Sequence, residues 1–174
     1  QICSGSSLPT GYASVDGDCD DSNAAVHPGA LEIVDGVDDN CDGKVDIVDS
    51  AVHHLGDDHY SVTVNSQFQV ATEGTAYSKS FTVANLQLYT KATLTITHRG
   101  VQKADPIKIN GQQISCGCGW DSPSDGSLGT TTISFDISIL QAGSNTISVT
   151  SSYDSWNHDY DDFEFQDIYI TLSN

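Results

Sequence analysis

The sequence contains no methionine and only 6 lysine and arginine residues, against 24 aspartate and glutamate residues. Without methionine, copper binding through thioether ligands is excluded. The net charge of −18 argues against binding to nucleic acid or to anionic membrane surfaces, both of which repel an acidic chain. No run of 18 apolar residues occurs, so the sequence encodes no membrane span. Cations are the partners that this composition favours.

Catalytic motifs are also missing. The sequence has no G-x-S-x-G, no H-E-x-x-H, no glycine-rich phosphate loop and no Cys–His motif. Asp161, Asp162 and Glu164 could be considered as glycosidase acids. However, Asp162 and Glu164 lead into a predicted strand at alternate positions, where polar residues at a strand edge are common. We therefore expect a protein that is not an enzyme.

The acidic residues are 21 aspartates and 3 glutamates. A solvated acidic surface, as in adaptation to high salt, would be expected to use glutamate freely, whereas short aspartate side chains suit turns that converge on an ion. Five cysteines, several of them beside acidic residues, favour an oxidising extracellular setting. The chain begins at Gln1 rather than methionine, which fits a processed mature protein or a boundary within a longer chain. We expect a secreted protein, outside the cell or at its surface.

The chain divides into two parts, residues 1–59 and residues 60–174. The first part has few large apolar side chains, so metal ions and disulfides would have to stabilise it. A short helix is expected there at Ala30–Val34. In the second part, apolar and polar residues alternate over short segments. These segments predict strands at 60–70, 77–84, 86–99, 106–115, 131–140, 145–151 and 163–172. Asn110-Gly111 predicts a two-residue hairpin turn. The pattern predicts an all-β fold, an antiparallel β-sandwich of jelly-roll type, preceded by a small loop-rich segment.

Residues 38–49 carry the most specific motif in the chain. Six candidate ligands occupy positions 1, 3, 5, 7, 9 and 12 of this stretch, and they are Asp38, Asn40, Asp42, Lys44 through its carbonyl, Asp46 and Asp49. Gly43 stands at the sixth position, which must turn sharply. This is the spacing of an EF-hand-type calcium loop. Asp49 stands where an EF-hand has a bidentate glutamate, which indicates looser capture, capture through water, or a loop of the dockerin or thrombospondin-repeat kind.

A second acidic cluster precedes this loop and consists of Asp16, Asp18, Asp20 and Asp21, joined by Glu32 and Asp35. The two clusters could hold two Ca²⁺ ions, or one ion with outer ligands. Carboxylates this dense repel one another unless a cation neutralises them. Cys19 and Cys41 flank the acidic runs, and we expect them to form a disulfide. The pairing of Cys3, Cys116 and Cys118 stays open, and an odd count allows a bond between molecules.

Three stretches of the first part share their order and spacing with a known family: DCDD at 18–21, HPGALE at 27–32 and DGVDDNCDG at 35–43. Residues 3–49 resemble the "putative metal-binding motif" family of secreted bacterial proteins. The resemblance implies a compact, disulfide-tied, calcium-holding knot that decorates larger proteins and is not itself an enzyme. The family commonly has a cysteine where this chain has Val34.

The second part resembles galactose-binding-type jelly rolls and carbohydrate-binding modules, through the segments DISILQAGSNTISV at 136–149 and DDFEFQDIYI at 161–170. Trp120, Trp156 and Tyr160 lie in polar loops beside carboxylates, an arrangement that suits the stacking of sugar rings. The same rings could instead anchor loops, or pack against the first part or a neighbouring subunit.

Two functions follow from these patterns. The main hypothesis is a non-enzymatic, calcium-stabilised structural protein that self-associates as a subunit of an extracellular or cell-surface assembly or filament. Its support is the ion-dependent first part, the odd cysteine count and the sheet edges available for strand addition. The alternative is a carbohydrate-binding, lectin-like module with glycans as partners. One or two Ca²⁺ ions are the expected cofactor.

Overall fold

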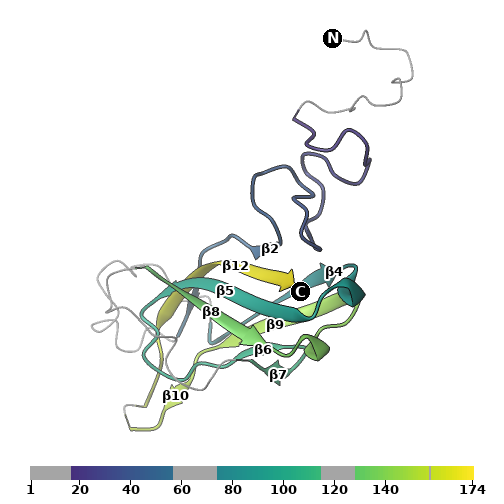
Figure 1. Ribbon diagram of the computed structural model, residues 1–174. Helices are drawn as coiled ribbons and strands as arrows, with labels where there is room; N and C mark the ends of the chain where they lie inside the picture. The colour runs from purple at the N-terminus through teal and green to yellow at the C-terminus, as the bar shows by residue number, and fades with distance from the viewer. Residues whose placement is uncertain (1–16, 57–73, 115–127, 157) are drawn as a thin grey trace.

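The computed structural model describes residues 17–56, 74–114, 128–156 and 158–174. Within them the chain is an all-β sandwich of two five-stranded sheets, as predicted (Figure 1). The first sheet has the order β1-β4-β9-β6-β7. The second has the order β2-β12-β5-β8, with β3 also paired to β12, and β10 and β11 form a separate pair. The strands are β1 (Ile33–Val34), β2 (Ile47–Asp49), β3 (His53–Leu55), β4 (Ala76–Val83), β5 (Lys91–Arg99), β6 (Ile107–Ile109), β7 (Gln112–Gln113), β8 (Gly129–Phe135), β9 (Gly143–Thr150), β10 (Tyr153–Asp154), β11 (Asp159–Tyr160) and β12 (Phe163–Ser173).

The core lies between the two sheets and follows from the alternation of the strands. On β5, every second residue from Ala92 to His98 is buried. Ile147 and Val149 of β9 are fully buried on the opposite sheet, and Ile107 lies beside them on β6. Strands that alternate in this way bury one face against a second sheet and leave the other face to solvent.

Strand β12 contains one irregularity, which the sequence marks. Phe165 and Ile168 are both buried although strict alternation would place them on opposite faces. The register against β5 shifts between Gln166 and Tyr169, and Asp167 has a φ of 49°. A β-bulge adds one residue to a strand, so the side chains after it face the core again, as that of Ile168 does.

Two groups of local predictions need correction. Residues 30–34 do not form a helix, because Ile33–Val34 pair in parallel with β4 and so satisfy their backbone groups in the sheet. The strands predicted at 86–99 and 131–140 each include a short 3₁₀ turn, η1 (Leu86–Leu88) and η2 (Ile137–Ile139). The side chain of Asp136 accepts a hydrogen bond from Ser138 N–H at 2.9 Å and so begins η2. The strand predicted at 60–70 lies outside the described residues.

The hairpin turn at Asn110-Gly111 is confirmed. It joins β6 to β7, with Ile109 opposite Gln112. Both central residues have positive φ, 50° for Asn110 and 79° for Gly111. This conformation is typical of two-residue hairpin turns and explains the Asn-Gly pair.

Residues 17–46, here called the N-terminal segment, lie at one end of the sandwich near β2, β4 and the C-terminus (Figure 1). The Tyr89 hydroxyl donates a hydrogen bond to the Asp35 carbonyl at 2.7 Å, and Ile170 N–H donates to the Asp46 carbonyl at 3.3 Å. Strands β2 and β3, which precede residue 60, pair with β12 and extend the second sheet. Neither 3₁₀ turn of the described residues has the length or apolarity of a membrane-spanning helix.

Candidate functional site

The N-terminal segment is held together by a disulfide and by buried polar groups. Cys19 and Cys41 are bonded, as predicted. Asp39 is 5% exposed, and its carboxylate accepts a hydrogen bond from Ile33 N–H at 2.9 Å. Its carbonyl accepts from His27 N–H at 2.9 Å. These bonds tie the beginning of the segment and β1 to the loop that follows.

The loop that begins at Asp38 folds around its own side-chain oxygens. The Asp38 carboxylate accepts hydrogen bonds from Asp42 N–H at 3.2 Å and Gly43 N–H at 2.8 Å. Asn40 Oδ1 also accepts from Asp42 N–H, at 3.0 Å, and Asp42 Oδ1 accepts from Lys44 N–H at 2.8 Å. Gly43 has a φ of 85°, the left-handed conformation that glycine adopts most readily. The alternating oxygens of the motif therefore share one short loop.

Three carboxylates converge at this loop. Glu32, Asp38 and Asp42 each place an oxygen within 4.8 Å of the others. Glu32 Oε1 accepts a hydrogen bond from Asp39 N–H at 3.0 Å, while Oε2 is buried without a hydrogen-bond partner among the described residues. Burial raises the pKa of Glu32, and the charges of Asp39, Asp38 and Asp42 raise it further, against the lowering effect of the Asp39 bond. A cation between the three carboxylates would relieve both the repulsion and the orphaned oxygen.

Two of the predicted ligands have other partners. Asp46 is 3% exposed, and its Oδ1 accepts hydrogen bonds from Asp35 N–H and Gly36 N–H, both at 2.8 Å. Burial raises the pKa of Asp46, although the two backbone bonds oppose the increase. Asp46 therefore braces the turn at residues 35–36. Neither Asp46 nor Asp49 belongs to the three-carboxylate group, within the part of the chain described.

Asp49 lies at the end of β2 and is 7% exposed. Its carboxylate accepts hydrogen bonds from the Tyr77 hydroxyl at 2.6 Å and Ala51 N–H at 3.0 Å. It also lies 3.2 Å from Lys79 Nζ and 3.1 Å from His53 Nε2. Burial would raise the pKa of Asp49, but these partners outweigh it and lower the pKa to about 2. Asp49 therefore links β2 to β4 through its contacts with Tyr77 and Lys79.

The remaining predicted ligands are spread along the segment. Asp35 accepts a hydrogen bond from Val37 N–H at 3.1 Å, and burial raises its pKa. Asp18 accepts from Asp20 N–H at 2.9 Å, and Asp20 accepts from the Ser22 hydroxyl at 2.6 Å. Among the described residues, the three-carboxylate group includes none of Asp18, Asp20, Asp21 and Asp35. Asp16 lies outside the described residues, and the Lys44 ammonium lies 3.8 Å from Asp167.

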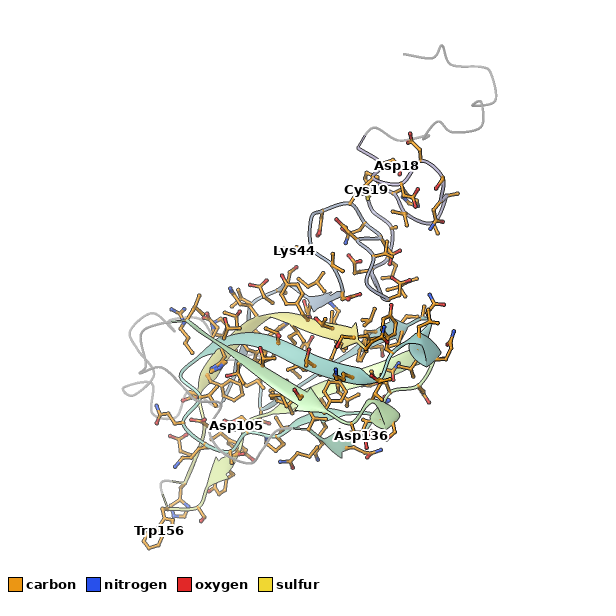
Figure 2. The ribbon with its side chains drawn as sticks, in the orientation of Figure 1. Asp18, Cys19, Lys44, Asp105, Asp136 and Trp156 are labelled. Atoms are coloured by element: carbon orange, nitrogen blue, oxygen red, sulfur yellow. A yellow bond between two sulfur atoms is a disulfide. The ribbon has the colours of Figure 1, made fainter. Side chains whose placement is uncertain are left out.

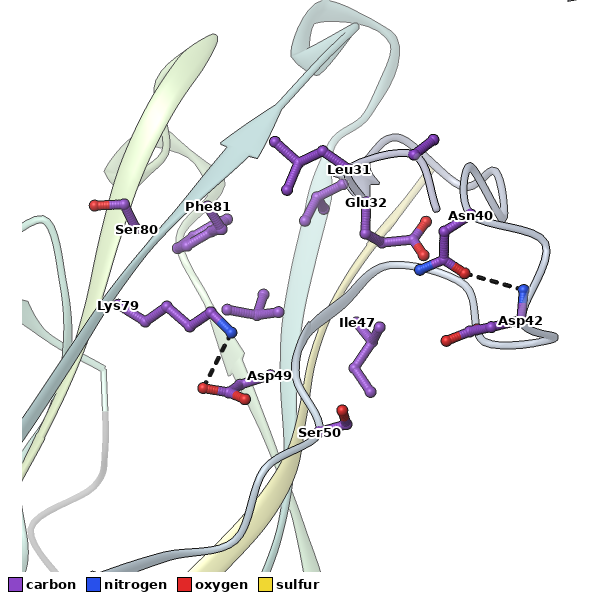
Figure 3. A pocket seen from close by; sticks show the side chains of 13 residues that line it. Leu31, Glu32, Asn40, Asp42, Ile47, Asp49, Ser50, Lys79, Ser80 and Phe81 are labelled. Atoms are coloured by element: carbon purple, nitrogen blue, oxygen red, sulfur yellow. Dashed lines mark hydrogen bonds and ion pairs between the residues drawn. The ribbon is translucent and has the colours of Figure 1, made fainter. Parts of the chain in front are cut away.

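A cleft of about 270 Å³ separates the loop from the sandwich (Figure 3). Glu32, Asn40 and Asp42 line the side of the N-terminal segment, and Lys79 and Phe81 line the side of β4. The cleft therefore gives a cation from solvent a path to two of the three carboxylates.

An aromatic hairpin lies at the other end of the molecule, and Figure 2 shows Trp156 there, far from Asp18. Strands β10 and β11 pair, with Tyr153 opposite Tyr160 and ring centroids 5.0 Å apart. Trp156 is 91% exposed and Tyr153 is 53% exposed. Tyr153 Oη lies 3.3 Å from His158 Nδ1. The structure thus places Trp156 and Tyr160 on one hairpin, while Trp120 lies outside the described residues.

The sequence gives little sign of the polar groups that anchor this end. Asp105 and Asp161 are buried together at the base of the hairpin, although a long stretch of chain separates them. Glu164, interpreted above as strand-edge polarity, is 5% exposed and lies 2.9 Å from an Arg99 guanidinium nitrogen and 3.1 Å from His54 Nε2. Glu164 meets His54 and Arg99 only because β12 pairs with β3 and β5, so no local spacing could have indicated this contact.

Solved structures similar to the chain include one enzyme and two smaller domains. A β-porphyranase of glycoside hydrolase family 86 from the human gut bacterium Bacteroides plebeius is 23% identical, with a TM-score of 0.35 over 57% of this chain and 18% of its own. This chain therefore spans less than a fifth of that enzyme. A family 35 carbohydrate-binding module from an environmental isolate is 14% identical, with a TM-score of 0.34 over 76% of this chain and 94% of its own.

The third structure is the CBM36-1 domain of a multidomain xylanase from the hindgut metagenome of Trinervitermes trinervoides. It is 13% identical, with a TM-score of 0.31 over 71% of this chain and 98% of its own. No curated protein sequence matches the chain. Residues 18–46 match the family model described as "Putative metal-binding motif". The chain thus carries this metal-binding motif in its N-terminal segment, ahead of a β-sandwich.

Proposed function

We propose that this chain is a non-catalytic, secreted carbohydrate-binding module whose N-terminal segment is stabilised by Ca²⁺. The observation that carries the proposal is the aromatic hairpin, where Trp156 is 91% exposed and Tyr153 is 53% exposed. Exposed rings on a small hairpin are an unusual use of large apolar side chains, which normally contribute to the core. Such rings suit the apolar faces of sugars, while the tyrosine hydroxyls can form hydrogen bonds to sugar hydroxyls.

The donor atoms support calcium as the cation. Carboxylates from Glu32, Asp38 and Asp42 and the amide oxygen of Asn40 are hard oxygen ligands, which Ca²⁺ prefers. Copper and zinc favour imidazole and thiolate ligands, and the only cysteine within the loop is bonded to Cys19. When bound, the ion would supply positive charge to the carboxylates and so hold Glu32 against the loop.

The disulfide and the calcium site both support a location outside the cell. Disulfides persist in oxidising compartments, and loops of moderate calcium affinity are filled where calcium is abundant. The aromatic hairpin gives the glycan-binding alternative a definite surface. Assembly into a filament stays a prediction, since its evidence would be a contact between chains.

Affinity electrophoresis through gels that contain neutral or acidic polysaccharides tests the glycan-binding function. We expect at least one polysaccharide to retard the wild-type chain, and we expect Trp156→Ala to abolish the retardation without lowering the unfolding midpoint. Leu88→Ala is the matched control, because Leu88 is also an exposed apolar side chain, at 60%. Equal retardation of the Trp156→Ala variant, or no retardation of the wild type by any polysaccharide, would contradict the proposal.

A further inference from the structure

The edges of the two sheets differ in how well they are protected against a further strand. In the first sheet, the outer strands β1 and β7 have two residues each, and the part of β4 beyond β1 carries the exposed Lys79. In the second sheet, β2 and β3 have three residues each. Short strands and edge lysines are devices that prevent pairing with another chain.

Strand β8 has neither device. It forms the other edge of the second sheet, beside β5 (Figure 1). It has seven residues, Gly129–Phe135, with no charged residue and no proline, and it pairs with β5 in an unbroken register. On its other side it pairs with no strand of the described residues. A long, regular and uncharged edge strand is a template for a further strand.

The core-facing side chains of β8 are incompletely covered. Ile133 and Phe135 pack against the core, yet both stay partly exposed. Leu94 and Ala92, which lie opposite them on β5, are 0% and 2% exposed. Within the described residues, β5 has a strand on both sides, whereas β8 has one on a single side. A strand added beside β8 would therefore cover apolar surface that the fold leaves open.

The outer face of β8 presents hydroxyl groups. Thr130, Thr132 and Ser134 are exposed at alternate positions. The hydroxyl oxygens of Thr132 and Thr95 lie 3.2 Å apart, and those of Thr130 and Thr97 lie 3.5 Å apart. This face thus already forms hydroxyl pairs across neighbouring strands, which stabilise a sheet.

The sequence of β8 is complementary to itself in the antiparallel direction. If Thr132 lies opposite Thr132 of a second copy, Thr130 lies opposite Ser134, so each exposed hydroxyl meets another hydroxyl. Gly129 then lies opposite Phe135, where the missing side chain leaves room for the ring. A second copy of the same strand therefore continues the pattern that β8 forms with β5.

We propose that β8 is a self-association surface, at which two copies of the chain pair antiparallel around Thr132 and join their second sheets into one. Such pairing uses the same strand of both copies, so it closes at a dimer and does not continue into a filament. One strand from each copy forms a small interface, which implies a dissociation constant of about 10 µM to about 1 mM. The inference goes beyond the proposed glycan-binding function and is independent of it, because the aromatic hairpin takes no part.

The charges of the chain favour this strand as the place of contact. Each copy has a net charge of −18, so two copies repel one another at long range. Strand β8 carries no acidic residue, and the neighbouring β5 carries only basic charges, Lys91 and Arg99 at its two ends. A strand without charge offers no ionic contact to a basic or acidic partner, whereas it suits a second copy of itself. Added salt screens the repulsion and should therefore strengthen the pairing.

Sedimentation equilibrium of the wild-type chain between about 10 µM and about 1 mM tests the pairing. We expect a monomer–dimer equilibrium whose dissociation constant falls as sodium chloride is raised from about 50 mM to about 500 mM. Amide exchange locates the contact. The amides of β8 should gain protection as the protein concentration rises, while those of residues 76–80, at the open part of β4, should not. A monomer at every concentration, association that weakens with salt, or protection gained at 76–80 in place of β8 would overturn the inference.

Substitution at the centre of β8 tests the register. Thr132→Lys places two like charges opposite each other in the dimer, so its dissociation constant should rise about tenfold or more. Thr171→Lys is the matched control, because it adds the same charge at an exposed position of β12, which lies inside the second sheet, and it should associate as the wild type does. An equimolar mixture of Thr132→Lys and Thr132→Asp should associate again, since opposite charges then meet. Undiminished association of Thr132→Lys, or no recovery in the mixture, would contradict pairing around Thr132.

Discussion

Glu32 reaches the loop of residues 38–43 because the chain between them folds back on itself. Its Oε1 accepts the Asp39 N–H at 3.0 Å, and one oxygen of its carboxylate lies within 4.8 Å of oxygens of Asp38 and Asp42. Asp49 is drawn away in the other direction, since β2 pairs with β12 and carries Asp49 to Tyr77. The carboxylate that complements the short motif thus comes from the N-terminal side of the loop.

Substitution of Glu32 and Asp49 should separate cation binding from sandwich stability. Glu32→Gln removes a negative charge from the three-carboxylate group, so we expect Ca²⁺ affinity to fall about tenfold or more, about 1.4 kcal/mol. Asp49→Asn should leave Ca²⁺ affinity unchanged but lower the free energy of unfolding, because Lys79 and Tyr77 lose a charged partner. Isothermal titration calorimetry and urea unfolding of both variants measure these effects. The reverse result, with affinity lost in Asp49→Asn only, would restore Asp49 as a ligand.

Local spacing was enough to predict the loop, whereas Glu32 was assigned to a second acidic cluster and its position beside Asp38 and Asp42 was not indicated. Asp38, Asn40 and Asp42 fold onto backbone N–H groups within the same short stretch, so the pattern of residue types contains the geometry. Glu32 approaches from outside that stretch. Its contribution depends on β1 pairing with β4, which no residue near position 32 indicates.

At the scale of secondary-structure elements, the N-terminal segment has few apolar contacts of its own. Val26 and Val34 are its only fully apolar side chains buried to 2% exposure or less, within the described residues. The Cys19–Cys41 disulfide restricts the unfolded chain, and β1 attaches the segment to β4. A segment of this kind should respond to loss of the disulfide more strongly than the sandwich does.

Replacement of both cysteines by serine, in a Cys19→Ser/Cys41→Ser variant, tests this difference. A loop of this length implies a loss of about 3 kcal/mol, confined to the segment. Amide exchange should therefore accelerate across residues 17–46, while the amides of β5 and β12 keep their protection as an internal control. Equal acceleration in β5 and β12 would show that the segment and the sandwich unfold as one unit.

The strands could be predicted where the information was local. Alternation marks β5, the Asn110-Gly111 pair marks the turn between β6 and β7, and the altered phase from Phe165 to Ile168 marks the bulge of β12. The two-residue β1 and the short β2 and β3 lack this signal. Their extended shape comes from the strands they join, β4 and β12, so it depends on contacts between distant residues.

At the scale of the whole molecule, the two candidate sites lie at opposite ends (Figure 2). The carboxylates around Asp42 border a cleft against β4, whereas Trp156 extends from the far end. A cation at Asp42 therefore cannot contact a sugar stacked on Trp156. Under the proposed function, this separation favours a structural role for the cation and recognition by the hairpin.

The cation should also reverse the way in which the stability of the N-terminal segment depends on pH. Burial raises the pKa of Glu32, Asp35 and Asp46 in the folded chain. For carboxyl groups with raised pKa, the stabilisation is complete below the unfolded values, near pH 4, and is lost as the pH rises through the folded values. Ca²⁺ binds the deprotonated carboxylates, so Ca²⁺ stabilises the segment more strongly as the pH rises over the same range. Asp49, with its pKa lowered to about 2, stabilises the fold fully throughout this window and loses that stabilisation only as the pH falls below it.

Amide exchange of residues 17–46, corrected for the intrinsic rate at each pH, measures this reversal. Metal-stripped protein should be better protected at about pH 4.5 than at about pH 7, and protein in millimolar Ca²⁺ should be better protected at about pH 7. The amides of β5 serve as the reference, because their strand contains none of these carboxyl groups. An identical pH trend with and without Ca²⁺ would mean that no cation neutralises Glu32, Asp38 and Asp42. The packing of the segment against β4 would then have to offset the repulsion between these carboxylates without a bound cation.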